Sequence, residues 1–291
     1  MNRFAGKTAV ISGGAEGIGF AIATALGEEG MNIVLADIDP NSLAQASEAL
    51  ERSGVAVLAV ALDVVSEAQW QVVTEHALAR FGKVHMVVNN AGIGGETGSI
   101  EQQDAKVWQW ALDVNLMGVV YGAKTMVPLI KEHGEGGWIV NVSSMAGMGG
   151  VPYSGAYSAT KMAVVALSES WAGELEKEGI AVSVLCPAFV QTRIHESHRN
   201  RQDIYRSKGT RHGEASRAAN NMSKAVENGI DPAIVGKRVV EALNAGELYI
   251  FTHPNYRPML QYRAKKIDEA FERAAQSSLL QHIVNQKIDM L

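Results

Sequence analysis

The chain has 291 residues, 47% of them hydrophobic and 20% charged, so it can bury a sizeable core and does not have the composition of a disordered chain. Its formal net charge of -5 argues against a nucleic-acid partner, because phosphate binding needs a concentrated positive face. Cys186 is the single cysteine, which excludes an internal disulfide and a zinc site built from cysteines and fits a reducing cytoplasm.

Short β-rich runs alternate along the chain with longer segments rich in Ala, Glu, Gln and Leu. The first run begins near Lys7, which leaves no room for a cleavable leader, and no run approaches the roughly 18 apolar residues of a membrane span. The alternation predicts parallel βαβ units, and the continuous apolar runs predict a doubly wound α/β sheet with helices on both faces. The predicted strands are Thr8–Ser12, Asn32–Ala36, Ala56–Leu62, Val84–Asn89, Trp138–Ser143, Ala181–Leu185 and Leu248–Thr252.

Residues 1–291 are predicted to form a single domain, because no linker rich in Pro, Ser or like charges interrupts them. Acidic caps before prolines at Asp39 and Asp231 predict two helix starts. Residues 192–229 are polar without a clear period, and we interpret them as a substrate lid. Residues 256–291 have apolar residues at helical spacing and predict a packed C-terminal helical extension.

A glycine-rich turn follows the first predicted strand and leads directly into a helix-like segment. Such a turn needs glycine where the backbone has positive φ or approaches a pyrophosphate, and the helix N-terminus supplies free N–H groups. The spacing is G-x-x-x-G-x-G, and Asp37 closes the second strand eighteen positions after Gly19, where its carboxylate can bind the adenosine ribose. The turn reads Ser12-Gly13-Gly14-Ala15-Glu16-Gly17-Ile18-Gly19.

Asp37 also favours NAD over NADP, because its carboxylate would lie against the extra 2′-phosphate of NADP. Glu16 would add a second repulsion. A like charge near 4 Å is worth roughly 1 to 4 kcal/mol, or about five- to several-hundredfold in affinity. The alternative is that Asp37 only caps the next helix, a role for which Asp39 is better placed.

Tyr157 and Lys161 lie four residues apart, one turn along a helix face, so Lys161 can lower the pKa of Tyr157 and make the phenol usable as a base. A second pair with the same spacing, Tyr262 and Lys266, lies in the predicted C-terminal helix. Only Tyr157 has a serine, Ser144, thirteen positions before it at the end of a predicted strand. We therefore expect Tyr157 to be the reactive residue.

The glycine turn, Asn89-Asn90-Ala91-Gly92, Asn115, Ser143-Ser144 and Tyr157-to-Lys161 together resemble the ordered motifs of classical short-chain dehydrogenases/reductases over roughly residues 5 to 193. The resemblance implies a seven-stranded Rossmann sheet with NAD across the carboxyl ends of the strands. It implies that Ser144 holds the substrate oxygen, Tyr157 exchanges its proton, Lys161 binds the nicotinamide ribose and Asn115 supports a proton relay.

The same resemblance implies further cofactor contacts, while two positions depart from the family pattern. The usual Pro-Gly reads Pro187-Ala188, and His85 stands where an acidic residue is common. A general-base role for His85 is the alternative to the structural role that we favour. The implied contacts are Ser12, Gly13, Glu16, Gly17, Ile18, Gly19, Asp37, Asp63, Val64, Asn90, Ala91, Gly92, Tyr157, Lys161, Pro187, Val190 and Thr192.

The substrate is expected to be a secondary alcohol or ketone, bulky and apolar or aromatic. Residues 249–258 resemble the tail of members that act on benzylic Cα alcohols. An anionic substrate is the alternative, because residues 193–224 hold eight Lys or Arg against three Asp or Glu, which we interpret as a solvated flap. The apolar pocket candidates are Met145, Met148, Val151, Pro152, Phe189 and Met222.

The predicted protein is a cytoplasmic NAD-dependent alcohol dehydrogenase or ketone reductase without a metal or a membrane partner. The resemblance implies a homotetramer, or less often a dimer, with the Tyr157 helix and the helix from Asp113 at an interface. One rival interpretation is a non-catalytic NAD-binding sensor or scaffold. A second is an epimerase or dehydratase of the extended branch, which normally has a different glycine spacing.

Overall fold

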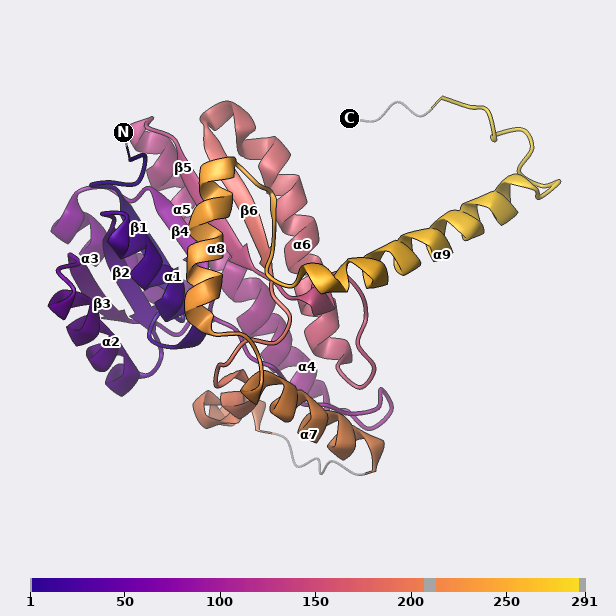
Figure 1. Cartoon of the computed structure of the whole chain (residues 1–291), viewed down its shortest axis with the longest axis horizontal. Coiled ribbons are helices and arrows are strands. Elements are labelled where there is room, and N and C mark those ends of the chain that lie inside the picture. The colour runs from indigo at the N-terminus through magenta and orange to yellow at the C-terminus, as the bar shows by residue number, and fades with distance from the viewer. Residues whose placement is uncertain (1, 207–212, 288–291) are drawn as a thin grey trace. The chain divides into compact units, whose positions relative to one another are not determined.

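Seven parallel strands form one sheet in the computed structural model, which describes residues 2–206 and 213–287 (Figure 1). Their order across the sheet is β3-β2-β1-β4-β5-β6-β7. Each predicted strand is confirmed, with ends within two residues of those expected. The strands are β1 (Thr8–Ser12), β2 (Asn32–Asp37), β3 (Val57–Ala61), β4 (Met86–Asn89), β5 (Gly137–Val142), β6 (Ile180–Cys186) and β7 (Tyr249–Phe251).

Helices cover both faces of this sheet, as the continuous apolar strands predicted (Figure 1). Each face has its own apolar cluster, one around Leu26 and Val239 and the other around Trp70 and Met126. The doubly wound α/β fold is therefore confirmed. One face carries α1 (Gly17–Glu28), α2 (Pro40–Arg52) and α8 (Pro232–Ala245), and the other α3 (Glu67–Phe81), α4 (Ala105–Leu112), α5 (Gly118–His133) and α6 (Gly155–Leu175).

Two of the helices start at the acidic caps that the sequence marks. The Asp39 carboxylate accepts hydrogen bonds from the N–H groups of Asn41 (3.0 Å) and Ser42 (3.3 Å), and proline occupies the first position of α2. The Asp231 carboxylate likewise accepts from the N–H of Ala233 (2.8 Å) at the start of α8. Because these caps satisfy otherwise unpaired N–H groups, they fix where each helix begins.

The direction of winding reverses between β1 and β4. From β1 the chain builds outward through β2 to β3, then returns to add β4 on the other side of β1. Ser12, at the end of β1, pairs in register with Ala36 and with Asn89. The carboxyl ends of these strands therefore meet at one edge, the position at which open α/β sheets bind ligands.

The predicted lid contains more regular structure than its sequence indicated. Two 3-10 segments, η4 (Ile194–Asn200) and η5 (Asp203–Tyr205), are followed by the helix α7 (Glu214–Glu227). Only Ala215 and Val226 of α7 are buried, so the narrow apolar face was too weak to reveal the helix. Residues 207–212 of the predicted lid lie outside the described residues, and its role stays a prediction.

Residues 253–291 form a compact unit separate from residues 1–252. Within it, α9 (Arg257–Ala275) confirms the predicted helix, and the packing of its apolar residues stays a prediction. No helix among the described residues is long and apolar enough to cross a bilayer.

Candidate active site

The turn between β1 and α1 is held by hydrogen bonds from the loop after β4. The Ser12 Oγ accepts from the backbone N–H groups of Asn90 (3.1 Å) and Ala91 (3.2 Å). The Asn90 Nδ2 in turn donates to the carbonyl oxygens of Ser12 (2.9 Å) and Gly13 (2.8 Å). A Cβ atom on Gly19 would lie 2.1 Å from the Gly13 carbonyl oxygen, so this tight turn requires glycine there.

The first turn of α1 presents a site for an anion. Gly17 and Ile18 begin the helix, and the N-cap residue Glu16 makes no capping hydrogen bond with its side chain. A Cβ atom on Gly17 would lie 2.9 Å from the Thr192 Cγ2, so Thr192 closes over this helix end. Uncapped N–H groups and the partial positive charge of a helix N-terminus suit a pyrophosphate.

Asp37 lies at the end of β2, beside this turn. Its Oδ2 accepts a hydrogen bond from the N–H of Ala15 and its Oδ1 from the N–H of Asp39, both at 3.1 Å. Burial raises the pKa of Asp37 above its ordinary value, and the backbone N–H groups oppose that rise. These two N–H groups hold the carboxylate beside the glycine turn, and its contact with a ribose stays a prediction.

Glu16 is paired with arginines that the sequence analysis did not connect to it. Its carboxylate contacts Arg193 Nη1 (3.1 Å) and Arg199 Nη2 (2.8 Å), and it accepts a hydrogen bond from Ser42 Oγ (2.7 Å). Two guanidinium groups offset its negative charge, which weakens the repulsion of NADP that the sequence predicts for Glu16. These contacts join residues 177 and 183 positions apart, a separation that no local spacing reveals.

Asp63 and Val64 follow β3 on the outer side of Asp37. The Asp63 Oδ1 accepts from the N–H of Val65 (3.3 Å), and its Oδ2 accepts from Gln202 Nε2 (2.7 Å). Val64 is buried against α5, where a Cβ atom on Gly118 would come within 2.8 Å of its Cγ2. Gln202 belongs to the predicted lid, and its contact with Asp63 was also missed from the sequence.

Tyr157 and Lys161 lie one turn apart on α6, and Ser144 follows β5, as predicted. Burial raises the pKa of Tyr157, and a hydrogen bond with Ser144 partly lowers it. Lys161 is 3% exposed, and burial lowers its pKa to about 8. Its Nζ donates to the Val142 carbonyl oxygen (2.9 Å) and lies 5.7 Å from the Tyr157 ring centre, so the expected net lowering of the Tyr157 pKa by Lys161 is not observed.

Asn115 is completely buried in η1 (Asp113–Met117), a π-helical turn between α4 and α5. Its Oδ1 accepts from the N–H of Ile93 (2.8 Å), and its Nδ2 donates to the Ile93 carbonyl (3.0 Å) and to Thr160 Oγ1 (3.3 Å). A Cβ atom on Gly92 would lie 3.3 Å from both Asn115 Oδ1 and Lys161 Nζ. Asn115 therefore lies near Lys161, and its role in a proton relay stays a prediction.

The loop after β6, which carries the departure at Ala188, is joined by backbone contacts to the segment after β5 and to Ile230. The Pro187 carbonyl accepts from the N–H of Met145 (2.8 Å), and Val190 is buried and bridges to Ile230. Among the described non-glycine residues, only Tyr153 has a positive φ, 62°. Ala188 thus adopts an ordinary backbone conformation, so the loop does not require glycine at that position.

The second Tyr-x-x-x-Lys pair has nearly the same internal geometry as the first. Lys266 Nζ lies 5.6 Å from the Tyr262 ring centre, but Tyr262 is 65% exposed and Lys266 pairs with Glu269 (3.2 Å). Tyr153 also differs from Tyr157, because its hydroxyl donates to the Glu214 carboxylate. Only Tyr157 combines a buried lysine with a serine hydroxyl.

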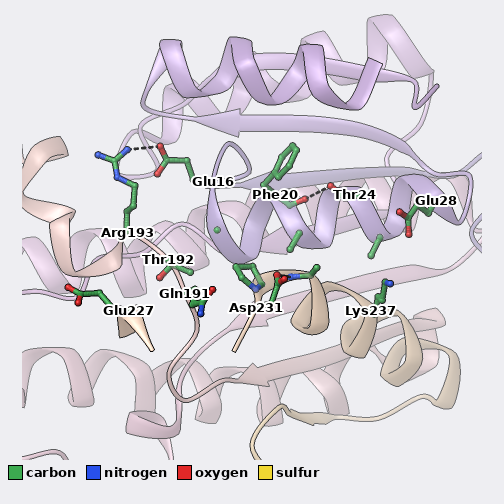
Figure 2. A pocket seen from close by; sticks show the side chains of 15 residues that line it. Glu16, Phe20, Thr24, Glu28, Gln191, Thr192, Arg193, Glu227, Asp231 and Lys237 are labelled. Carbon is green, nitrogen blue, oxygen red and sulfur yellow. Dashed lines mark hydrogen bonds and ion pairs between the residues drawn. The ribbon is translucent and has the colours of Figure 1, made fainter. Parts of the chain in front are cut away.

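A groove of about 880 Å³ borders the predicted cofactor site along α1 and α8 (Figure 2). The segment Gln191–Arg193 forms one end of it, where Arg193 contacts Glu16. None of Asn115, Ser144, Tyr157 and Lys161 lines this groove. Of the predicted substrate-pocket residues, Met145 is buried and Val151 is 39% exposed, and their contact with substrate stays a prediction.

His85 lies at the opposite edge of the sheet, among groups that resemble metal ligands. Its Nδ1 accepts from the N–H of Thr8 (3.2 Å), and its Nε2 hydrogen-bonds the Glu135 carboxylate (3.1 Å). His133 Nε2 lies 2.9 Å from the Val84 carbonyl, and its Nδ1 accepts from the N–H of Glu135 (3.1 Å). Because every ring nitrogen of this cluster is engaged, His85 has a structural role here.

Comparison with known proteins agrees with this geometry. The family model described as short chain dehydrogenase matches residues 7–203. A protein named CLA biosynthesis dehydrogenase/reductase from Lactiplantibacillus plantarum is 33% identical over 92% of this chain and 95% of its own length. A C alpha-dehydrogenase from Sphingobium sp. (strain NBRC 103272 / SYK-6) is 32% identical over 90% of this chain and 85% of its own.

A solved structure is similar as well. The crystal structure of a short chain dehydrogenase/reductase from Burkholderia phymatum in complex with NAD has a TM-score of 0.89 and 36% sequence identity. The alignment covers 93% of this chain and 97% of that one. The likeness thus includes the sheet, both helical layers and the glycine turn.

Proposed function

The chain belongs to the short-chain dehydrogenase family of oxidoreductases, and from that premise we propose that it transfers hydride between NAD and a secondary alcohol or ketone. The observation that carries the proposal is the pair of half-buried residues Ser144 and Tyr157 next to the buried Lys161 and Asn115, at the same sheet edge as the glycine turn. A half-buried phenol beside a serine hydroxyl and an ammonium can hold and move a proton at a carbonyl oxygen.

The residues at this edge fit NAD. The glycine turn and the start of α1 suit the pyrophosphate, and Asp37 suits an unphosphorylated ribose. The similar protein from Burkholderia phymatum was solved with NAD, which supports the same cofactor here. The glycine turn and Asp37 would hold the cofactor here, and it would supply the hydride acceptor for alcohol oxidation or, as NADH, the hydride donor for ketone reduction.

Each side chain of the proposed site has its own role in moving a proton to or from the substrate oxygen. Ser144 and Tyr157 donate hydrogen bonds to the substrate oxygen, which carries growing negative charge during ketone reduction. Tyr157 gives its proton to that oxygen in reduction and takes it back in oxidation. Lys161 would bind the nicotinamide ribose of the cofactor, and Asn115 holds the backbone of Ile93 near Lys161.

A bulky apolar or aromatic alcohol is the substrate class that we favour. The relative from Sphingobium is named a C alpha-dehydrogenase, and the sequence of residues 249–258 already pointed to Cα alcohols. Apolar candidates such as Met145, Met148 and Phe189 follow β5 and β6, on the side of Ser144. We further propose a cytoplasmic homotetramer with α5 and α6 at its interface.

The test measures absorbance at 340 nm with purified protein, NAD or NADP, and a panel of benzylic and alicyclic secondary alcohols and ketones. Tyr157→Phe should lower kcat by at least about a thousandfold, because it removes the exchangeable proton. Tyr262→Phe is the matched control: it alters a tyrosine with the same lysine spacing but high exposure, and should keep full activity.

Two results would contradict the proposal. Full activity of Tyr157→Phe would exclude the phenol as the proton carrier. NAD binding by the native chain without turnover of any alcohol or ketone would favour a sensor without catalysis.

A further inference from the structure

The strand order places the parts of a bound dinucleotide along the sheet edge. A pyrophosphate at the turn after β1 and a ribose on Asp37 after β2 direct the attached base toward β3, the next strand outward. Asp63 lies two residues beyond the end of β3, and the Leu62 N–H before it donates to the Asp37 carbonyl (2.8 Å). If the proposed function holds, the adenine ring lies beside Asp63, a contact that the family resemblance also implies.

Gln202 reaches this position from the segment between η4 and η5. A carboxylate only accepts hydrogen bonds, so the contact of 2.7 Å with Asp63 Oδ2 requires the amide nitrogen of Gln202 to face Asp63. The Gln202 Oε1, on the same amide group, is buried and has no hydrogen-bond partner. An unpaired buried acceptor is costly, which points to a donor that is supplied by a ligand.

The segment that carries Gln202 is anchored on both sides of it. Arg199 pairs with Glu16 at the glycine turn (2.8 Å). The Arg201 guanidinium lies 4.7 Å from the Trp110 ring centre and pairs with Glu96, and its side chain is 8% exposed. These contacts hold residues 199–202 between the glycine turn and α4, which gives Gln202 a defined position.

Tyr205 completes the anchoring beyond Gln202. Its hydroxyl donates to Asp113 Oδ2 (2.8 Å), and the side chain is buried. We call residues 199–205 the adenosine clamp. The clamp reaches from Glu16, beside the proposed pyrophosphate position, to Asp113, at the start of η1.

We propose that the adenosine clamp closes over the adenine ring and that Gln202 and Asp63 together recognise its 6-amino group. An amino group has two N–H donors, one for the Asp63 carboxylate and one for Gln202 Oε1. A 6-oxo purine offers an acceptor at the same place and would face two acceptor oxygens. Gln202 is then a specificity-determining residue for the cofactor, and this inference rests on the proposed function.

The test is equilibrium binding by calorimetry with NAD and with nicotinamide hypoxanthine dinucleotide, in which a 6-oxo group replaces the 6-amino group. The native chain should bind NAD more tightly by roughly 10- to 100-fold, the cost of an unmatched buried polar group. Gln202→Met should weaken NAD binding about tenfold and leave binding of the 6-oxo analogue nearly unchanged, so that the ratio of the two dissociation constants falls.

Gln109→Met is the matched control, because Gln109 also donates to an aspartate at 2.7 Å, on Asp113, but is exposed. This control should keep the native ratio of the dissociation constants for the two dinucleotides. If Gln202→Met kept that ratio while melting at the native temperature, Gln202 would be a structural contact only. If the native chain bound neither dinucleotide, the proposed function would fail and this inference with it. Native NAD binding with an unchanged ratio in Gln202→Met would overturn this inference alone.

Discussion

The two Tyr-x-x-x-Lys pairs show what a local pattern can and cannot predict at the scale of single residues. Their lysine-to-ring distances are 5.7 and 5.6 Å, so spacing alone produces the same geometry twice. The two pairs differ in burial: Lys161 is buried, whereas Tyr262 and Lys266 are exposed. Burial depends on strands and helices that are distant in sequence. The serine thirteen residues before Tyr157 was the one sequence signal for that difference, because it marks the end of β5 at the same sheet edge.

The pH dependence of the reaction should follow the raised pKa of Tyr157. Oxidation needs the phenolate as proton acceptor, so its kcat/KM should rise from neutral to alkaline pH. Reduction needs the protonated phenol and should be faster near neutrality. A pH profile in both directions tests this, and identical profiles would contradict it.

Replacing the Asp37 carboxylate should reduce the preference for NAD. Asp37→Asn removes a negative charge while its remaining carbonyl oxygen can still accept a backbone hydrogen bond. The ratio of kcat/KM for NAD to that for NADP should fall by about tenfold or more, since a like charge near the 2′-phosphate costs roughly 1 to 4 kcal/mol. Asp39→Asn is the control, because asparagine also caps helices. A native preference for NADP would refute this role of Asp37.

At the scale of elements, the strands were predictable because each is a continuous apolar run buried on both faces. The helix α7 was not, since only two of its residues are buried. Likewise, the contacts of Arg193 and Arg199 with Glu16 cannot be predicted from the spacing of residues in the sequence, because they depend on the tertiary path of η4. The motif residues of the site could be predicted, and the residues that cover it could not.

The cluster of His85 and Glu135 should make stability depend on pH. Burial lowers the pKa of His85 below its ordinary value of 6.5, and its Nδ1 must stay unprotonated to accept the Thr8 N–H. The contribution of neutral His85 to the free energy of unfolding is complete above about pH 6.5. It is lost as pH falls below that value, because the histidine has the higher pKa in the unfolded chain and is protonated there before it is protonated in the folded chain. Glu135, whose pKa is lowered to about 2, adds a separate loss below about pH 4.5.

Thermal melting between pH 7 and pH 5 tests the histidine contribution. His85→Gln removes the titrating group and should melt with a smaller difference in Tm between these pH values. His76→Gln, which alters an exposed histidine of α3, should keep the native difference. Equal differences in the two variants would show that His85 does not contribute to the pH dependence.

At the scale of the whole molecule, α6 presents a row of small exposed residues suited to close helix contact. Ala159, Ala166, Ser170 and Gly173 are exposed and recur at roughly helical spacing. If α6 forms the proposed interface, Ala166→Arg should convert the native tetramer to a smaller species in light scattering. Ala245→Arg, at an exposed position at the end of α8, should leave the mass unchanged. A native monomer would contradict the proposed assembly.

The contact between α1 and α8 limits when the chain can finish folding. A Cβ atom on Gly236 would lie 2.2 Å from the Ala21 carbonyl oxygen, so the first helix and a helix near the end of the Rossmann unit pack almost backbone to backbone. The ribosome synthesises α1 more than two hundred residues before it reaches α8. A nascent chain therefore exposes the apolar side of α1 until translation is nearly complete, and contacts of such separation form slowly. Chaperone binding during this interval would protect that surface from aggregation.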